Sequence, residues 1–222
     1  MPLTFYGHPL SSYCHKVLIA LYETGAPFTF RQIDPSQQAD RDLMASLTPM
    51  GKMPALVDDE AGVTLGESAI IIEWLDRHHP GPAPLLPRDP DAALQARTWN
   101  NIFDYHVMRE AQQIVDARLF MDDAAEEPIG VFARNSLDRS YAAIDRHMAG
   151  REWAAGDFGL ADCAAVPALF YAGFLHPFDD RPNLAAYFER LLARPSVARV
   201  HDEAKPWLQY FPFPERIPQR FR

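Results

Sequence analysis

The sequence predicts an α/β sandwich at the N-terminal end of the chain, followed by an all-helical domain. Over the first 80 residues, short apolar runs and helical patterns alternate in the order β-α-β, α, β-β-α. Five prolines then fall within residues 80–90, where neither a helix nor a central strand can continue. From Asp91 onward the apolar spacing is helical almost to the end. We therefore expect an α/β domain over residues 1–80, a linker over residues 81–90 and a helical domain over residues 91–222.

The elements of the α/β part follow from local signals. Residues 3–6 form a short apolar run that glycine and proline end, so a buried strand is predicted. A helix follows, from a serine cap at Ser11 or Ser12 to Gly25, which suits the left-handed position after a helix. Alternation and turn chemistry predict a strand over residues 28–33, a short helix over 40–47, a hairpin with strands 55–57 and 63–65, and a helix over 68–78. This order implies one sheet with a parallel and an antiparallel pair of strands.

The helical half is predicted to be a bundle around one central helix. Residues 160–174 are apolar on all sides, which is the pattern of a helix buried in the middle of a bundle. Gly159 occupies the cap position before that helix, and Asp162 is placed to bond back to the backbone there. The other helices are expected over residues 91–118, 130–147, 183–193 and 196–204, with an irregular segment at the end of the chain.

Composition indicates a globular protein of a reducing compartment. Its 222 residues are 48% apolar, enough for a proper core, and its net charge of −9 argues against a nucleic-acid backbone as partner. Cys14 and Cys163 are the only cysteines and lie far apart, so no disulfide framework is expected. No basic leader opens the chain and no apolar run reaches about 18 residues, which favours a cytoplasmic protein without a membrane span. The eight histidines lack metal-ligand spacing, and no metal is expected.

The segment Ser11-Ser12-Tyr13-Cys14 lies where the first strand gives way to a helix. Free N–H groups and the positive end of the helix dipole favour an anion at such a junction. A serine hydroxyl there can donate a hydrogen bond to a thiolate brought in by a cofactor. Lowering a thiol pKa from about 8.5 by two units needs about 2.7 kcal/mol, and a hydrogen bond to a charged group supplies about 1.5–3 kcal/mol. The alternative is that either serine is only a helix cap.

Two further segments add to this pattern. Lys52-Met53-Pro54 precedes the predicted hairpin, and Glu67-Ser68 follows it at the start of a helix. Ser68 can offer its N–H and its hydroxyl to a carboxylate, while Glu67 can accept a hydrogen bond from an α-amino group. A cap would explain Ser68 alone, but the pair together matches both charges of a γ-glutamyl head group. Lys52 either pairs with a carboxylate or is an ordinary solvated lysine of a loop.

On these three segments the chain resembles the glutathione transferase family over nearly its whole length, in particular its serine-type, theta-, phi- or zeta-like branch. The resemblance implies a thioredoxin-like fold for the first domain and glutathione as co-substrate. Ser11 then stands where thioredoxin-like proteins keep the first cysteine of C-x-x-C, and it activates the glutathione thiol. Ser12 is one rival for that role. Tyr6 is the other, because tyrosine-type members keep their phenol at the end of this strand, whereas Cys14 is expected to pack as a small apolar residue.

The same resemblance assigns the binding residues. Pro54 is expected to be a cis-proline, so that Met53 presents its backbone to the cysteinyl unit of glutathione. The other residues assigned to glutathione are Lys52, Glu67, Ser68 and, for the glycyl carboxylate, Arg41. A second, apolar pocket is assigned to the other substrate, with Pro9, Leu10, Phe103 and His106 as lining, together with Tyr105 and Met108 of the same helix. Core or dimer packing is the alternative for the residues of that helix.

The activity implied by the resemblance is conjugation of glutathione to small apolar electrophiles, a detoxification reaction, in a homodimer with no nucleic-acid or membrane partner. Two alternatives on the same scaffold remain open. A glutathione-dependent isomerase or reductive dehalogenase would regenerate glutathione, and a non-catalytic relative would serve as a binding protein.

Overall fold

A four-stranded sheet forms the N-terminal part of the computed structural model, which describes residues 3–121 and 123–222. The central strand β1 (Leu3–Gly7) pairs in parallel with β2 (Phe28–Gln32) and antiparallel with β3 (Ala55–Asp58). The edge strand β4 (Val63–Leu65) pairs antiparallel with β3, which gives the order β2-β1-β3-β4. The prediction of a parallel and an antiparallel pair in one sheet is thus confirmed.

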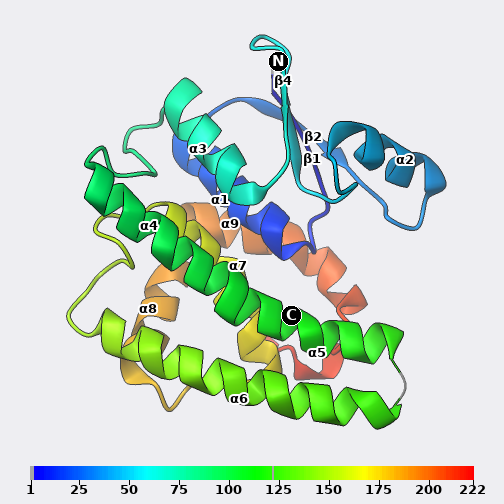
Figure 1. Cartoon of the computed structure of the whole chain (residues 1–222), viewed down its shortest axis with the longest axis vertical. Coiled ribbons are helices and arrows are strands. Elements are labelled where there is room, and N and C mark those ends of the chain that lie inside the picture. The colour runs from blue at the N-terminus through cyan, green and yellow to red at the C-terminus, as the bar shows by residue number, and fades with distance from the viewer. Residues whose placement is uncertain (1–2, 122) are drawn as a thin grey trace.

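Helices cover both faces of this sheet. α1 (Ser12–Thr24) and α3 (Ser68–His78) pack against each other on the face that meets the helical half, whereas α2 (Gln38–Leu47) lies on the other side (Figure 1). α1 ends as expected, because Gly25 has the left-handed φ of 69° and its N–H bonds back to the carbonyl of Leu21. The face under α2 has a small core of its own, formed by Ile33, Met44 and Ala55.

The helical half is a bundle around α7 (Leu160–Leu175), in which every residue except Gly173 is buried. α4 (Pro90–Phe103), the π-helical turn η1 (Asp104–Met108) and α5 (Arg109–Phe120) follow one another as one long rod, and α6 (Asp123–Met148) runs beside it (Figure 1). The bundle is completed by α8 (Pro182–Leu192), α9 (Pro195–Ala204) and short 3-10 turns over residues 205–210, 214–216 and 219–221. None of the helices in the described ranges is long and apolar enough to cross a bilayer.

Three details of the helical half differ from the sequence-based expectation. The segment predicted as one regular helix contains the π-helical turn, which inserts one extra residue into the helical repeat. α6 begins at Asp123 rather than at residue 130 and continues through Pro128, since packing of the helix against α5 overrides the local preference of proline. The end of the chain, expected to be irregular, folds into the 3-10 turns and contributes buried Phe211 and Phe213 to the core.

The two halves meet through buried backbone and side-chain contacts. α1 packs directly on α7, so one apolar core is shared by the sheet and the bundle. The linker residue Leu85 takes part in two bonds: its N–H donates to Asp76 of α3 at 2.6 Å, and its carbonyl accepts from Leu160 N at 2.8 Å. A Cβ on Gly159 would overlap that carbonyl, which explains why the cap of α7 is glycine rather than serine or threonine.

Candidate functional site

The first of two neighbouring cavities has a volume of about 740 Å³ and lies between the loop before β3, the start of α3 and the junction of α4 with the π-helical turn. It brings together the residues that the sequence assigned to glutathione, apart from Arg41. Those residues are Lys52, Met53, Pro54, Glu67 and Ser68. Residues from the helical half close the opposite wall, among them Asn100, Asn101, Asp104 and Tyr105.

The loop before β3 has the expected backbone geometry. The Met53–Pro54 peptide bond is cis, so this prediction is confirmed. Thr48 donates from its hydroxyl to the carbonyl of Lys52 at 3.3 Å and ties the two ends of the loop together. Met53 therefore stands at the edge of the first cavity with its position fixed on both sides.

Glu67 has a strained backbone at the entrance to α3. Its φ of 62° and ψ of 109° make it the one non-glycine residue with positive φ among those the structure describes. Such conformations cost about 1–3 kcal/mol and concentrate at functional sites. The N–H groups of the first turn of α3, beginning at Ser68, have no partner inside the helix and lie at the wall of the first cavity. A carboxylate and the N–H groups of a helix start thus lie next to each other in the wall of the first cavity.

Arg41 does not contribute to either cavity. Its guanidinium donates at 2.7 Å to the carbonyls of Pro35 and Ser36 and at 2.6 Å to the side chain of Gln38. These bonds hold the side chain over its own loop, and the structure does not bring it to the residues assigned to glutathione.

The second cavity has a volume of about 410 Å³ and adjoins the first, because Tyr13 and Met53 line both. Ser11, Ser12 and Leu10 form one side of it. The remaining lining is mostly apolar and comes from the helical half: Met108, Ala111, Gln112, Val115, Leu119, Tyr171, Leu175, Tyr210, Phe211 and Pro212. An apolar compartment therefore lies next to the polar one, and Ser11 belongs to the wall of the apolar compartment.

Ser11 is the N-cap of α1. Its Oγ accepts from the N–H of Cys14 at 3.4 Å, a long bond that uses a lone pair of the oxygen and not the hydroxyl hydrogen. Ser12 begins the helix itself and is buried. Tyr6 packs against the small core under α2 and lines neither cavity. Of the three candidates, Ser11 alone combines a place in a cavity wall with only partial burial.

Neither cysteine is reactive in this environment. Cys14 is fully buried against Gly7, and burial raises the pKa of its thiol to about 11. Cys163 is also fully buried, and burial raises its pKa as well. The prediction that Cys14 packs as a small apolar residue is confirmed.

Tyr13, which lines both cavities, is not an acid under neutral conditions. Burial and the nearby carboxylate of Asp104 raise the pKa of its phenol to about 12. Its hydroxyl therefore stays protonated near neutral pH and can only take part in hydrogen bonds.

The other residues assigned to the second substrate are divided among different places. Phe103 is fully buried and packs near Trp99 and Tyr187, and His106 is exposed without lining either cavity. Pro9 lines a separate hollow beside Tyr22. Leu10 and Met108 do line the second cavity, whereas Tyr105 lines the first.

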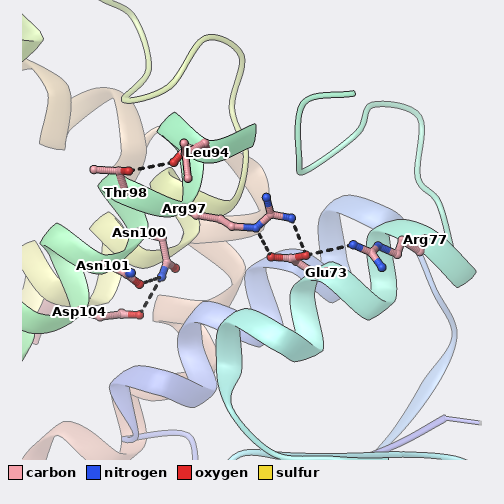
Figure 2. A network of polar contacts seen from close by, with 8 residues as sticks. All are labelled: Glu73, Arg77, Leu94, Arg97, Thr98, Asn100, Asn101 and Asp104. Atoms are coloured by element: carbon pink, nitrogen blue, oxygen red, sulfur yellow. Dashed lines mark hydrogen bonds and ion pairs between the residues drawn. The ribbon is translucent and has the colours of Figure 1, made fainter. Parts of the chain in front are cut away.

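Polar side chains connect the sheet domain with the helical half beside the first cavity. Lys16 of α1 is fully buried and donates at 2.7 Å to Asp104, which also accepts from Asn100 at 3.2 Å. Figure 2 shows Asn100 between Asn101 and Asp104, with the bidentate pair of Arg97 and Glu73 alongside, at 2.7 and 2.9 Å. These contacts join α1 and α3 to α4 and the π-helical turn beside the first cavity.

Apart from Tyr105 and Met108, sequence reasoning missed the residues that the helical half contributes to the two cavities. One signal was present in the sequence: Asn100 and Asp104 are polar residues four positions apart on the buried side of α4 and η1. Polar residues at such spacing on an apolar face need partners, which indicates a site or an interface. Tyr210, Phe211 and Pro212 had no comparable signal.

Comparisons with known proteins agree with this architecture. The glutathione S-transferase N-terminal domain matches residues 5–83, and the glutathione S-transferase C-terminal domain matches residues 107–195. Glutathione S-transferase 3 of Zea mays is 30% identical over 210 residues, which are 90% of this chain and 93% of the relative. Glutathione S-transferase GstB of Escherichia coli (strain K12) is 28% identical over 207 residues, covering 89% and 97%.

A solved structure gives the same result in three dimensions. The glutathione S-transferase of Methylobacterium radiotolerans, in complex with glutathione sulfonate, is 34% identical with a TM-score of 0.76. The match covers 89% of this chain and 93% of that one. With a thioredoxin-like sheet, a helical second half and matches along both, the chain belongs to the glutathione S-transferase family.

Proposed function

We propose that this protein binds glutathione in the first cavity, activates its thiol at Ser11 and transfers the thiolate to small apolar electrophiles held in the second cavity. The observation that carries the proposal is that Ser11 lines the second cavity, which borders the first along Tyr13 and Met53. A sulfur atom at this border has polar partners for the tripeptide on one side and apolar walls on the other.

The first cavity suits a small, charged peptide. Its volume of about 740 Å³ falls in the usual range of small-molecule sites, about 300–1,000 Å³. Glu67 supplies an acceptor for the α-ammonium group, and Ser68 with the helix start supplies donors for the adjacent carboxylate. Met53, next to the cis-proline, is placed to pair its backbone with the cysteinyl unit.

The cap and the catalytic roles of Ser11 are compatible. A hydroxyl has one hydrogen to donate and two lone pairs to accept with, and the cap uses only a lone pair. The free hydrogen can therefore bond a thiolate, worth about 1.5–3 kcal/mol, and the N-terminus of α1 adds about 0.3–1 kcal/mol for a nearby anion. Together these cover the roughly 2.7 kcal/mol that a two-unit decrease of a thiol pKa requires.

The transfer step needs only the thiolate and the electrophile. The sulfur lone pair forms the new sulfur–carbon bond while the electrophilic carbon releases its leaving group, or while an activated double bond takes up the electron pair and then a proton from water. No group of the chain has to change its charge permanently.

The test is a screen of aryl halides, epoxides and unsaturated carbonyl compounds with glutathione present and absent. With isotopically labelled glutathione, the label should accumulate in a thioether conjugate. Label that returns to free glutathione while the electrophile is isomerised or dehalogenated would overturn the transferase proposal in favour of those activities. If calorimetry detects no glutathione binding, the protein is a non-catalytic member of the family.

Glu67→Ala should weaken glutathione binding without changing the pKa of the bound thiol, because Glu67 is assigned to the γ-glutamyl head and not to the sulfur. Loss of a charge-assisted hydrogen bond should cost about 1.5–3 kcal/mol of binding free energy. Calorimetry measures the affinity, and Glu60→Ala, an exposed glutamate in the β3–β4 turn, is the matched control. Unchanged affinity in Glu67→Ala would remove this residue from the site.

We further propose that the protein is a homodimer in which the first domain of one subunit meets the helices of the other. Large apolar side chains remain exposed around the first cavity and on α4, among them Met50, Ile70, Leu94 and Tyr105. Their burial between subunits would remove apolar surface from water. Light scattering at micromolar concentration should give twice 25.1 kDa, and Leu94→Arg should shift the protein toward the monomer. A particle of 25.1 kDa in the unmodified protein would contradict the dimer.

A further inference from the structure

The three residues that precede Ser11 are held by hydrogen bonds from several parts of the molecule. The carbonyl of Pro9 accepts from Nε2 of His15 at 2.5 Å, and the carbonyl of Leu10 accepts from the hydroxyl of Tyr171 at 2.8 Å. Within the segment, Leu10 N donates to Nδ1 of His8 at 3.1 Å and Ser11 N donates to the carbonyl of His8 at 3.0 Å. Both consecutive carbonyls before Ser11 are therefore fixed from outside the segment.

The contact from His15 defines its protonation. A carbonyl can only accept, so the ring donates from Nε2 and Nδ1 carries no hydrogen. His15 is fully buried, and burial lowers the pKa of its imidazole to about 4, which keeps the ring neutral near pH 7. Its Nδ1 is buried without a hydrogen-bond partner in the described part of the chain. Burial of an unpaired nitrogen is unfavourable, yet the His15 ring keeps its bond to the Pro9 carbonyl. This indicates that the position of the Pro9 backbone is important.

The contact from Tyr171 links the segment to the second cavity. Tyr171 belongs to α7 in the helical half, and its side chain lines the second cavity together with Phe211. Burial raises the pKa of the phenol, so the hydroxyl keeps the hydrogen that it donates to Leu10. One side chain thus touches both the space for the electrophile and the residue next to Ser11.

The hydroxyl of Ser11 is weakly fixed, although its backbone N–H and carbonyl make hydrogen bonds of 3.0 Å. Its cap bond of 3.4 Å exceeds the usual 2.7–3.2 Å or so of a good N–H···O bond. A hydroxyl that must reach a sulfur needs a defined position, since a misplacement of about 1 Å in a catalytic group can cost about 100-fold in rate. The position of the hydroxyl must therefore be defined by the backbone before Ser11, because the cap bond does not define it.

We propose that His15 and Tyr171 are positioning residues that hold Pro9 and Leu10 so that the Ser11 hydroxyl meets the glutathione sulfur. The inference rests on the proposed function, in which Ser11 activates the thiol. In this proposal α1, through His15, and α7, through Tyr171, act together in catalysis. Neither side chain is proposed to touch the sulfur.

The decisive test compares two tyrosines that make the same kind of bond. Tyr171→Phe removes the hydroxyl bonded to Leu10, and Tyr141→Phe removes the hydroxyl bonded at 3.1 Å to the carbonyl of His176, in an equally buried place outside both cavities. Both variants should lower Tm by similar amounts and leave the glutathione Kd within about twofold. Only Tyr171→Phe should raise the pKa of the bound thiol, by half a unit to one unit, with a fall of about threefold in kcat/KM near pH 7.

His15 supplies a second, independent pair of variants. His15→Gln keeps an amide that can donate to the Pro9 carbonyl, whereas His15→Leu removes the donor and keeps an apolar side chain. The thiol pKa should rise in His15→Leu and return toward the original value in His15→Gln. The inference would be overturned if the pKa of the bound glutathione thiol in His15→Leu and in Tyr171→Phe were the same as in the unmodified protein.

The outcomes separate this inference from the proposed function. If the thiol of bound glutathione is not acidified in the unmodified protein, or Ser11→Ala leaves it acidified, the role of Ser11 fails. If Ser11→Ala abolishes the acidification but Tyr171→Phe does not reduce it, the positioning role alone fails. In the Ser11→Ala background, Tyr171→Phe should have no further effect on the thiol pKa, and an effect of the same size there would contradict the inference.

Discussion

Ser11→Ala should raise the pKa of the bound glutathione thiol by about two units and reduce turnover near pH 7 by one to two powers of ten. The variant loses the hydroxyl in the wall of the second cavity but keeps Met53, Glu67 and Ser68. Glutathione should therefore still bind, while only a few per cent of its sulfur remains as thiolate. Ultraviolet titration of the thiolate at saturating glutathione measures the pKa directly.

Two controls separate Ser11 from its rivals. Tyr6→Phe should change the thiol pKa little, because the ring packs under α2 and lines neither cavity. Cys14→Ser should retain most activity, since the thiol of Cys14 is fully buried and burial raises its pKa to about 11, whereas a dithiol mechanism would not tolerate this substitution. A raised pKa in Tyr6→Phe with an unchanged one in Ser11→Ala would assign the protein to the tyrosine-type enzymes.

Asp162→Ala should destabilise the protein by at least about 3 kcal/mol and lower Tm by roughly 6–12 °C. The carboxylate of Asp162 is fully buried and accepts three hydrogen bonds: from Ala154 N at 3.0 Å, from Gly159 N at 3.0 Å and from the Tyr187 hydroxyl at 2.6 Å. Alanine would leave three buried donors without a partner at the start of the central helix. Thermal and urea unfolding measure the loss.

Asp145→Ala is the matched control for burial. Its carboxylate also accepts from two backbone N–H groups at a helix start, those of Asn183 at 2.8 Å and Leu184 at 3.0 Å, but this site is partly exposed. Water can replace the lost acceptor there, so the expected cost is only about 1 kcal/mol. Equal destabilisation by the two substitutions would show that burial is not the cause at Asp162.

Local patterns, together with the family resemblance, were sufficient to predict the sheet and the residues that the sheet domain contributes to the cavities. Ser11, Met53–Pro54 and Glu67–Ser68 lie at junctions between elements, where caps, turns and a cis-proline leave recognisable residues in the sequence. Because the sheet order then brings these junctions to one end of the domain, their juxtaposition followed from topology.

The helical wall of the site could not be predicted in the same way. The sequence-based argument assumed regular α-helical periodicity across Phe103 and His106, whereas the π-helical turn inserts a residue and rotates everything after it by about 100°. Of the candidates on this segment, Met108 lines the second cavity and His106 does not. The contributions of Tyr171 and Phe211 depend on packing between segments about 160 or more residues apart from Leu10, for which a single sequence carries no local signal.

The bonds of Leu85 limit how the two halves can be exchanged between relatives. The N–H of Leu85 is satisfied by α3 and its carbonyl by the first residue of α7, so one peptide segment belongs to both sides of the boundary. A chimaera cut within the linker would need a recipient with a carboxylate at the place of Asp76 and a glycine at the place of Gly159. Recombination should therefore succeed between chains that share both residues and fail where a side chain replaces that glycine, whatever the similarity of their catalytic segments.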